Sequence, residues 1–141
     1  MKFTLPALLI ISLSNTSVAA KPFHNEIPSV FHGNWGSAAE DCADEYGVNT
    51  FFIDAESVNY YESNDYLLIG VEFMGAMTGG GSGSLFNGRF TSRMETFLLG
   101  ESDIRFEIDD DNKNILYRYP IGEDGEPIVS RQVRSVRCTS N

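Results

Sequence analysis

The residues best suited to catalysis are few in this chain of 141 residues. It holds two histidines, His24 and His32, and two cysteines, Cys42 and Cys138. Histidine is the usual general base near neutral pH, and zinc sites combine histidine nitrogens with cysteine thiolates. The sequence contains no nucleophile elbow, no paired-histidine zinc motif and no Walker loop. We therefore predict a protein that is not an enzyme and that needs no metal or other cofactor.

Two further segments look like binding motifs. The run Asp109–Asn114 carries the hard oxygen ligands that calcium prefers. An EF-hand counted from Asp109 needs glycine sixth and glutamate twelfth, where this chain has Asn114 and Pro120. We interpret the run as a hairpin turn. The glycine-rich segment Gly75–Ser84 lacks the Gly-Lys-Ser/Thr ending of a phosphate cradle, and we expect it to form a loop at a barrel mouth.

The first twenty residues have the pattern of a secretory signal. Lys2 precedes an apolar run that ends at Leu13, and Val18 and Ala20 occupy the small-residue positions before a cleavage site. We predict a signal peptide over residues 1–20 and one domain over residues 21–141. The apolar run is shorter than the roughly 20 residues that span a bilayer. We therefore expect an exported protein, periplasmic or secreted, that does not insert into a membrane.

The two cysteines predict a disulfide. Cys42 and Cys138 would enter an oxidising compartment together, where thiols pair. Closing so long a loop restricts the unfolded chain by as much as roughly 4 to 5 kcal/mol in the chain-entropy model. The bridge would join the start of the domain to its end.

The chain is acidic, with 20 acidic and 10 basic residues and a net charge of −10. Removal of the signal peptide takes away Lys2 and would make the charge −11. A negative surface disfavours nucleic acid and anionic membranes, and it attracts cationic partners. Acidity also keeps an exported protein soluble, and we expect a monomer.

The hydrophobic periodicity is that of strands. Ile104, Phe106 and Ile108 alternate with charged residues, and Leu67, Ile69, Val71 and Phe73 fall on one face of a second run. "NG" at Asn87–Gly88 is the preferred pair for a tight hairpin turn. Further strands are predicted over Thr50–Ile53, Val58–Glu62, Arg93–Leu99, Ile115–Tyr119 and Ile128–Cys138, with turns at "DDDNKN" and "GEDGEP".

One short helix is predicted near the N-terminus of the domain. Ser37 and Glu40 have the spacing of a capping box, and Gly47 would end the helix within about three turns. Many short strands in a chain of this size predict an all-β fold. We expect a small antiparallel barrel of eight or nine strands with one short helix and one disulfide.

The segment around the single tryptophan favours a barrel over a sandwich. Phe31, Gly33 and Trp35 share one face of an extended segment, and the glycine leaves room for the indole. Here the chain resembles the calycin superfamily of lipocalin-like barrels, marked by Gly-x-Trp on the first strand. The resemblance implies that Trp35 closes the barrel floor and that an arginine of the last strand packs over it. Arg137 is the candidate, with Arg134 as the alternative.

A closer likeness is to short exported bacterial proteins without an assigned activity, and it spans nearly the whole mature chain. The residues that carry it are Ile27, Pro28, Gly33, Trp35, Cys42, Tyr61, Glu62, Ser63, Arg137 and Cys138. A mature chain of 121 residues is short for a lipocalin, which argues against a roomy cavity.

Two functions follow from these expectations. The first is a carrier that holds a small apolar or aromatic ligand, because nine phenylalanines and six tyrosines follow the signal peptide. Its candidate ligand-binding residues are Tyr60, Phe73, Phe97 and Phe106. The alternative is an inhibitor or partner of a cationic secreted protein, such as a lysozyme or a protease, bound by the acidic outer surface. A cavity of several hundred Å³ would favour the carrier.

Overall fold

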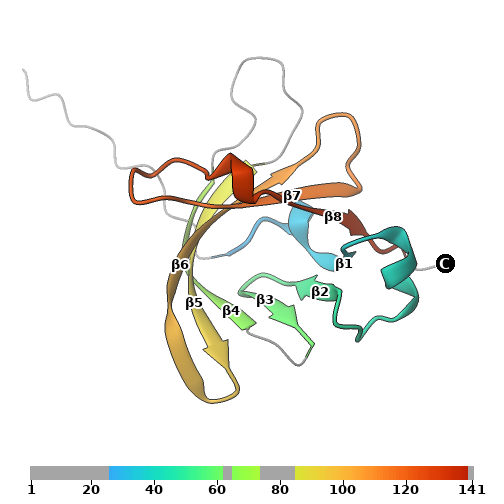
Figure 1. The fold of residues 1–141 in the computed structure, drawn as a ribbon, viewed down its shortest axis with the longest axis horizontal. Coiled ribbons are helices and arrows are strands. Elements are labelled where there is room, and N and C mark those ends of the chain that lie inside the picture. Colours follow the sequence, from blue (N-terminus) through green and yellow to red (C-terminus); the bar gives the residue numbers. More distant parts are fainter. Residues whose placement is uncertain (1–25, 62–64, 74–84, 140–141) are drawn as a thin grey trace, which may run out of the picture.

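The computed structural model describes residues 26–61, 65–73 and 85–139. Within these ranges eight antiparallel strands form one closed barrel, in which each strand pairs with the next and β8 pairs with β1 (Figure 1). The predicted small antiparallel barrel is confirmed, with eight strands. They are β1 (Gly33–Gly36), β2 (Thr50–Ile53), β3 (Ser57–Tyr60), β4 (Asp65–Phe73), β5 (Leu85–Met94), β6 (Phe97–Ile108), β7 (Ile115–Pro120) and β8 (Val133–Arg137).

Several predicted features lie outside the described residues. These are the signal peptide over residues 1–20, the glycine-rich segment over residues 75–84, and Glu62 and Ser63 of the family likeness.

The predicted helix is a 3-10 helix, η2 (Ala39–Ala43), and its cap differs from the prediction. The backbone N–H of Ala38 donates to Asp41 Oδ2 at 2.8 Å, so Asp41 takes the place expected for Glu40. The Ser37 hydroxyl instead donates to the Asn49 carbonyl at 3.3 Å. The helix ends at Ala43 because Asp44 has an extended backbone, and Gly47 lies in the turn beyond it. The structure also contains the 3-10 helices η1 (Ser29–Phe31) and η3 (Val129–Arg131).

The predicted turn at Asn87–Gly88 is wrong. Both residues lie within β5, and Gly88 is there for a packing reason. A Cβ on Gly88 would come 2.4 Å from the Phe90 ring and 3.1 Å from the Phe86 ring. The glycine therefore leaves the space that these two buried rings occupy on the inner face of the strand.

The predicted strand Arg93–Leu99 is also wrong, because it contains the turn of the β5–β6 hairpin. The chain reverses at Glu95 and Thr96, and Glu95 has a φ of 53°, in the left-handed region. Beyond the turn, Phe97 and Leu98 are 67% and 69% exposed. The last predicted strand is also shorter than expected, because Val129–Arg131 form η3 before β8 begins.

The face predicted for β4 changes partway along the strand. A β-bulge separates Leu68, which pairs with Phe90, from Gly70, which pairs with Arg89. Ile69 is the extra residue and is 48% exposed, whereas Val71 is fully buried. A bulge adds one residue to one strand only, so it shifts the inward set by one position. Tyr66, Leu68 and Val71 therefore belong to the core side.

The core fills the barrel from the end at which β1 begins. Ile27 and Phe31 precede β1 and are both buried, and the Ile27 N–H donates to the Ala55 carbonyl in the β2–β3 turn. The Phe31 ring lies 4.7 Å from the Phe86 ring in an edge-to-face contact. Phe86 in turn stacks on Phe106 at 4.7 Å. The predicted alternation in β6 is confirmed, because Phe106 and Ile108 are buried and Ile104 packs against the core.

The two predicted acidic turns are hairpin connections. In "DDDNKN", Asp109 accepts hydrogen bonds from the backbone N–H groups of Asp111 and Asn112, at 2.9 and 2.8 Å. The hydrogen bond from Asn112 is the largest cause that lowers the pKa of Asp109. The segment "GEDGEP" connects β7 to η3. None of the helices in the described ranges has the length and apolar character needed to cross a membrane.

Candidate functional site

Trp35 and Arg137 form the centre of the end at which β1 begins, which we call the closed end. The two residues are paired between β1 and β8, and the Arg137 Cζ lies 4.1 Å from the centroid of the Trp35 ring. Trp35 is fully buried, and its Nε1 donates to the Phe31 carbonyl at 2.9 Å. Gly33 has a φ of 120°, which a residue with a Cβ rarely adopts, and it lies beside the guanidinium.

The hydrogen bonds of Arg137 are made to the backbone that precedes β1. Its Nη1 donates to the His32 carbonyl at 2.7 Å, and its Nη2 donates to the Val30 carbonyl at 2.6 Å. Burial lowers the pKa of the guanidinium. Of the two arginines named from the sequence, Arg137 covers Trp35. Arg134 is exposed on β8, opposite Tyr117 of β7.

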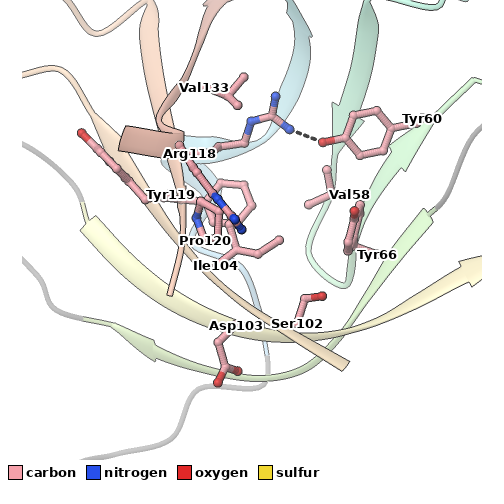
Figure 2. Close-up of a pocket in the computed structure, with 12 residues that line it drawn as sticks. Val58, Tyr60, Tyr66, Ser102, Asp103, Ile104, Arg118, Tyr119, Pro120 and Val133 are labelled. Atoms are coloured by element: carbon pink, nitrogen blue, oxygen red, sulfur yellow. Dashed lines mark hydrogen bonds between the residues drawn. The ribbon is translucent and has the colours of Figure 1, made fainter. Parts of the chain in front are cut away.

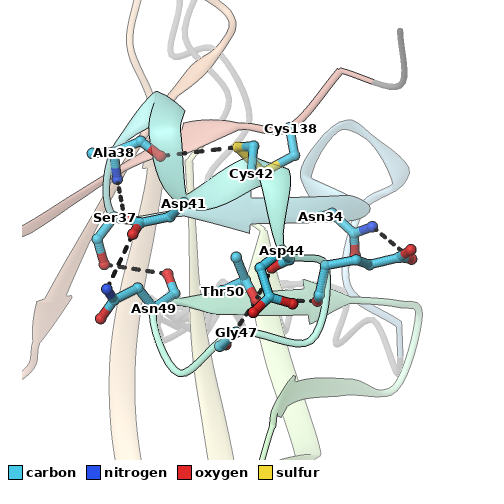
Figure 3. Close-up of a disulfide and its surroundings, with 11 residues drawn as sticks. Asn34, Ser37, Ala38, Asp41, Cys42, Asp44, Gly47, Asn49, Thr50 and Cys138 are labelled. Carbon is cyan, nitrogen blue, oxygen red and sulfur yellow. Dashed lines mark hydrogen bonds between the residues drawn. A yellow bond between two sulfur atoms is a disulfide. The ribbon is translucent and has the colours of Figure 1, made fainter.

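The disulfide joins η2 to the end of β8 (Figure 3). Cys42 and Cys138 are bonded as predicted, across a sequence separation of 96 residues. The Cys138 N–H donates to the Asn34 carbonyl at 2.9 Å, which places the bridge beside the β1–β8 seam. Asp41 also accepts from the Asn49 side chain at 3.0 Å and so holds η2 against the loop that leads to β2. The bridge therefore closes a seam that has only two paired positions.

Of the two histidines, His32 lies in the described part of the chain, and its ring contacts the backbone. His32 lies just before β1, is half-buried, and has its Nε2 2.7 Å from the Ile27 carbonyl. Across the described ranges, no three His, Cys, Asp or Glu side chains gather closely enough to hold a metal ion.

A cavity of about 450 Å³ lies at the opposite end, which we call the open end (Figure 2). It is located where β3 and β7 finish and where β4 and β8 begin. Its walls are mostly apolar or aromatic. The residues that line it are Val58, Tyr60, Tyr66, Ser102, Asp103, Ile104, Phe106, Arg118, Tyr119, Pro120, Arg131 and Val133.

Two of the four candidate ligand-binding residues line this cavity, Tyr60 and Phe106. Phe97 does not join them, because it follows the Glu95–Thr96 turn and is exposed on the β5–β6 hairpin. Phe73 pairs with Phe86 at the closed end of β4, away from the cavity, and its side chain is outside the described part of the structure. Tyr66 takes part instead, with its ring 5.8 Å from that of Tyr60.

The charged residues of the cavity are unevenly compensated. Asp103 accepts two hydrogen bonds from Arg89, at 2.8 and 2.9 Å, and these lower its pKa. Arg131 is exposed at the rim. Arg118 reaches across the barrel from β7 to the Tyr60 hydroxyl on β3, as Figure 2 shows. A full positive charge therefore lies inside the mouth of the barrel.

The sequence interpretation missed Arg118, although a signal was present. In β7, Leu116 and Arg118 share one face, and Leu116 is fully buried. A charged residue two positions from a core leucine in a strand is either at a barrel rim or in an internal polar site. The contact between Arg118 and Tyr60 spans 58 residues of sequence, so a local pattern does not identify its partner.

Comparisons of the chain with protein-family models, with curated proteins and with solved structures give no match.

Proposed function

We propose that this chain is an exported, non-enzymatic protein that binds one small apolar or aromatic molecule at the open end of its barrel. The observation that carries the proposal is the cavity of about 450 Å³. Small-molecule sites are concave, mostly apolar and roughly 300 to 1,000 Å³ in volume. A core filled from end to end would have argued for the inhibitor function instead.

The division of the interior supports this proposal. Phe31, Phe86 and Phe106 make ring contacts with one another toward the closed end, and Trp35 is buried there. The ring cluster of the closed end therefore does not include Tyr60 and Tyr66. Tyr60 and Tyr66 of the mouth remain half-buried and line the cavity. Aromatic rings that are partly exposed to solvent are suited to contact with a ligand.

The test uses Nile red, a neutral apolar dye that fluoresces strongly when it leaves water. Titration into the oxidised protein should give a saturable rise in emission. Ile104→Trp fills the cavity from β6 and should abolish the rise. Leu98→Trp is the matched control, because it places the same indole on the exposed β5–β6 hairpin and should leave binding unchanged.

The proposal fails if the wild-type protein gives no saturable rise. It also fails at this location if folded Ile104→Trp protein binds the dye as well as the wild type does. Thermal unfolding of both tryptophan variants checks that each is folded.

A second candidate function is a partner of a cationic secreted protein such as a lysozyme, and the β5–β6 hairpin favours it. Met94, Phe97, Leu98 and Leu99 are exposed there, beside Glu95 and Glu101. Exposed apolar patches often mark protein interaction sites. Gel filtration with a basic lysozyme should show a complex that high salt weakens, since salt screens steering between opposite charges. Two separate elution peaks at low salt would exclude that partner.

A further inference from the structure

Arg118 has an unusual environment for a positive charge. Its Cζ lies 4.1 Å from the centroid of the Phe51 ring and 5.8 Å from that of the Tyr60 ring. Its Nη1 donates to the Tyr60 hydroxyl, and its Nη2 lies 3.4 Å from the Ser135 hydroxyl. Its Nε is buried and has no acceptor. The guanidinium is thus held by rings and neutral hydroxyls.

No carboxylate of the described residues forms an ion pair with Arg118. Asp103, the acidic residue of the cavity lining, is engaged by Arg89 instead. Tyr60 does not supply the missing charge, because a tyrosine has an ordinary pKa of about 10 and burial raises the pKa of Tyr60 further. Arg93 also has a buried Nε without an acceptor, but its Nη2 lies 3.4 Å from the Asp65 carboxylate. Arg118 lacks such a partner.

An uncompensated charge in an apolar wall is costly, and buried charges in proteins are normally paired. The guanidinium is planar, and its parallel N–H groups match the two oxygens of a carboxylate. The cavity also carries Arg131 at its rim, although the whole chain has a net charge of −10. The mouth is therefore a basic spot on an acidic protein.

We propose that the molecule bound at the open end carries a carboxylate, which pairs with Arg118 while its apolar body lies against Val58, Tyr66 and Ile104. The proposal rests on the proposed function and names the chemical class of its ligand. Tyr60 is a positioning residue, because its hydroxyl holds the guanidinium from the opposite side of the barrel. A neutral ligand of the same shape fills the cavity but leaves Arg118 unpaired.

The test compares three ligands with the same apolar chain: decanoic acid, decanol and decyl sulfate. Each displaces Nile red from the wild-type protein, from Arg118→Met and from Arg134→Met. Decanoic acid should bind the wild type roughly 10- to 100-fold more tightly than decanol, the range for a hydrogen bond to a charged group. Arg118→Met should remove this preference and leave decanol affinity unchanged. Arg134→Met removes the same charge from the exposed outer face and should keep the preference.

Three results would overturn the proposal. Equal affinities of the acid and the alcohol for the wild type would show that Arg118 selects no anion, while dye binding would still support the proposed function. An equal loss of dye, acid and alcohol in folded Arg118→Met would make the arginine structural only. Tighter binding of decyl sulfate than of decanoic acid would replace the carboxylate with a sulfate-like head group. The first comparison needs no variant, and Arg118→Gln provides a second one if Arg118→Met does not fold.

Discussion

The two ends of the barrel each place an arginine over an aromatic ring, and they differ in how that arginine is satisfied. The Cζ-to-centroid distance is 4.1 Å for both Arg137 over Trp35 and Arg118 over Phe51. Arg137 also donates to two backbone carbonyls, whereas Arg118 has two neutral hydroxyls and an Nε without an acceptor. The same arginine–ring contact is therefore accompanied by backbone hydrogen bonds at the closed end. At the open end it is accompanied by a guanidinium Nε that has no acceptor.

The cause of the difference is the origin of the hydrogen-bond partners. The carbonyls of Val30 and His32 come from the segment that leads into β1 and are held by η1 and by the strand. Backbone acceptors of this kind are fixed when the fold forms. At the open end, Arg118 relies on side chains of β3 and β8. The backbone acceptors of Arg137 therefore stabilise the closed end, whereas Arg118 at the open end still has a donor without an acceptor.

The largest effect is expected from the disulfide, which joins η2 to the end of β8 beside the β1–β8 seam. Cys42→Ser with Cys138→Ser should lower the free energy of unfolding by about 2 to 5 kcal/mol, because the unfolded chain regains the freedom of a long loop. Urea denaturation followed by Trp35 fluorescence measures this. This experiment uses the protein without the Leu98→Trp substitution, because a second tryptophan would obscure the fluorescence of Trp35. Equal unfolding midpoints for the oxidised wild type and the double variant would refute the assignment of the bridge as the main clamp.

Arg137→Met should be the next most damaging change. It removes two hydrogen bonds from a charged donor and a cation–π contact, and we expect a loss of about 2 to 4 kcal/mol. The emission of Trp35 should shift as well, because the cation leaves its ring. Arg134→Met is the matched control on the same strand and should change the stability by less than about 0.5 kcal/mol. If both variants lose the same stability, the Trp35 contact is not what holds this end.

The closed end was far easier to predict from the sequence than the open end. Gly33, Trp35 and the two cysteines are residue types that have few alternative structural roles. Together they predicted that the first strand, the tryptophan and the disulfide lie in one region of the barrel. The turn at Asn87–Gly88 failed for a physical reason. The dipeptide preference describes Asn87 and Gly88 alone, whereas in the barrel the space beside Gly88 is filled by the rings of Phe86 and Phe90, which pack into the core from the same strand.

The open end depends on register, which the sequence pattern does not fix. The bulge at Ile69 changes which residues of β4 face inward, and it brings Tyr66 and Val71 to the core side. A strict alternation along this strand placed Leu67 with Val71 instead. The pairing of Arg118 with Tyr60 requires the closure of the whole barrel, because the two strands are not neighbours. Site residues of this kind emerge only from the complete topology.

Asp54 should make the closed end sensitive to acid. It caps the β2–β3 turn, where burial opposes its ionisation but hydrogen bonds from the backbone of Glu56 and Ser57 prevail and lower its pKa. A pKa that is lower in the folded state gives stability above the unfolded value of about 4, and this is lost as the pH falls further. Asp54→Asn should cost about 1 kcal/mol near neutral pH.

The measurement is the difference in unfolding free energy between wild type and Asp54→Asn as a function of pH. The difference should shrink as the pH falls below about 4, because the wild-type carboxylate becomes protonated. Asp111 lies on the exposed β6–β7 turn, and Asp111→Asn serves as the control for a general charge effect. A difference that stays constant down to low pH would show that the hydrogen bonds to Asp54 do not depend on its charge.

Arg118→Met should have the smallest effect on stability, and it tests the comparison most directly. The variant loses the contact with Phe51, worth roughly 0.5 to 2 kcal/mol, but it also removes a half-buried charge that has no carboxylate partner and whose partial desolvation is unfavourable. These two contributions oppose each other, so the ligand-free protein should stay within about 1 kcal/mol of the wild type. Arg137→Met, which changes the same residue type over a ring at the same distance, should lose more. If urea denaturation gives equal losses of unfolding free energy for Arg118→Met and Arg137→Met, Arg118 stabilises the fold as much as Arg137 does. The open end would then lack an unpaired charge for a ligand to neutralise.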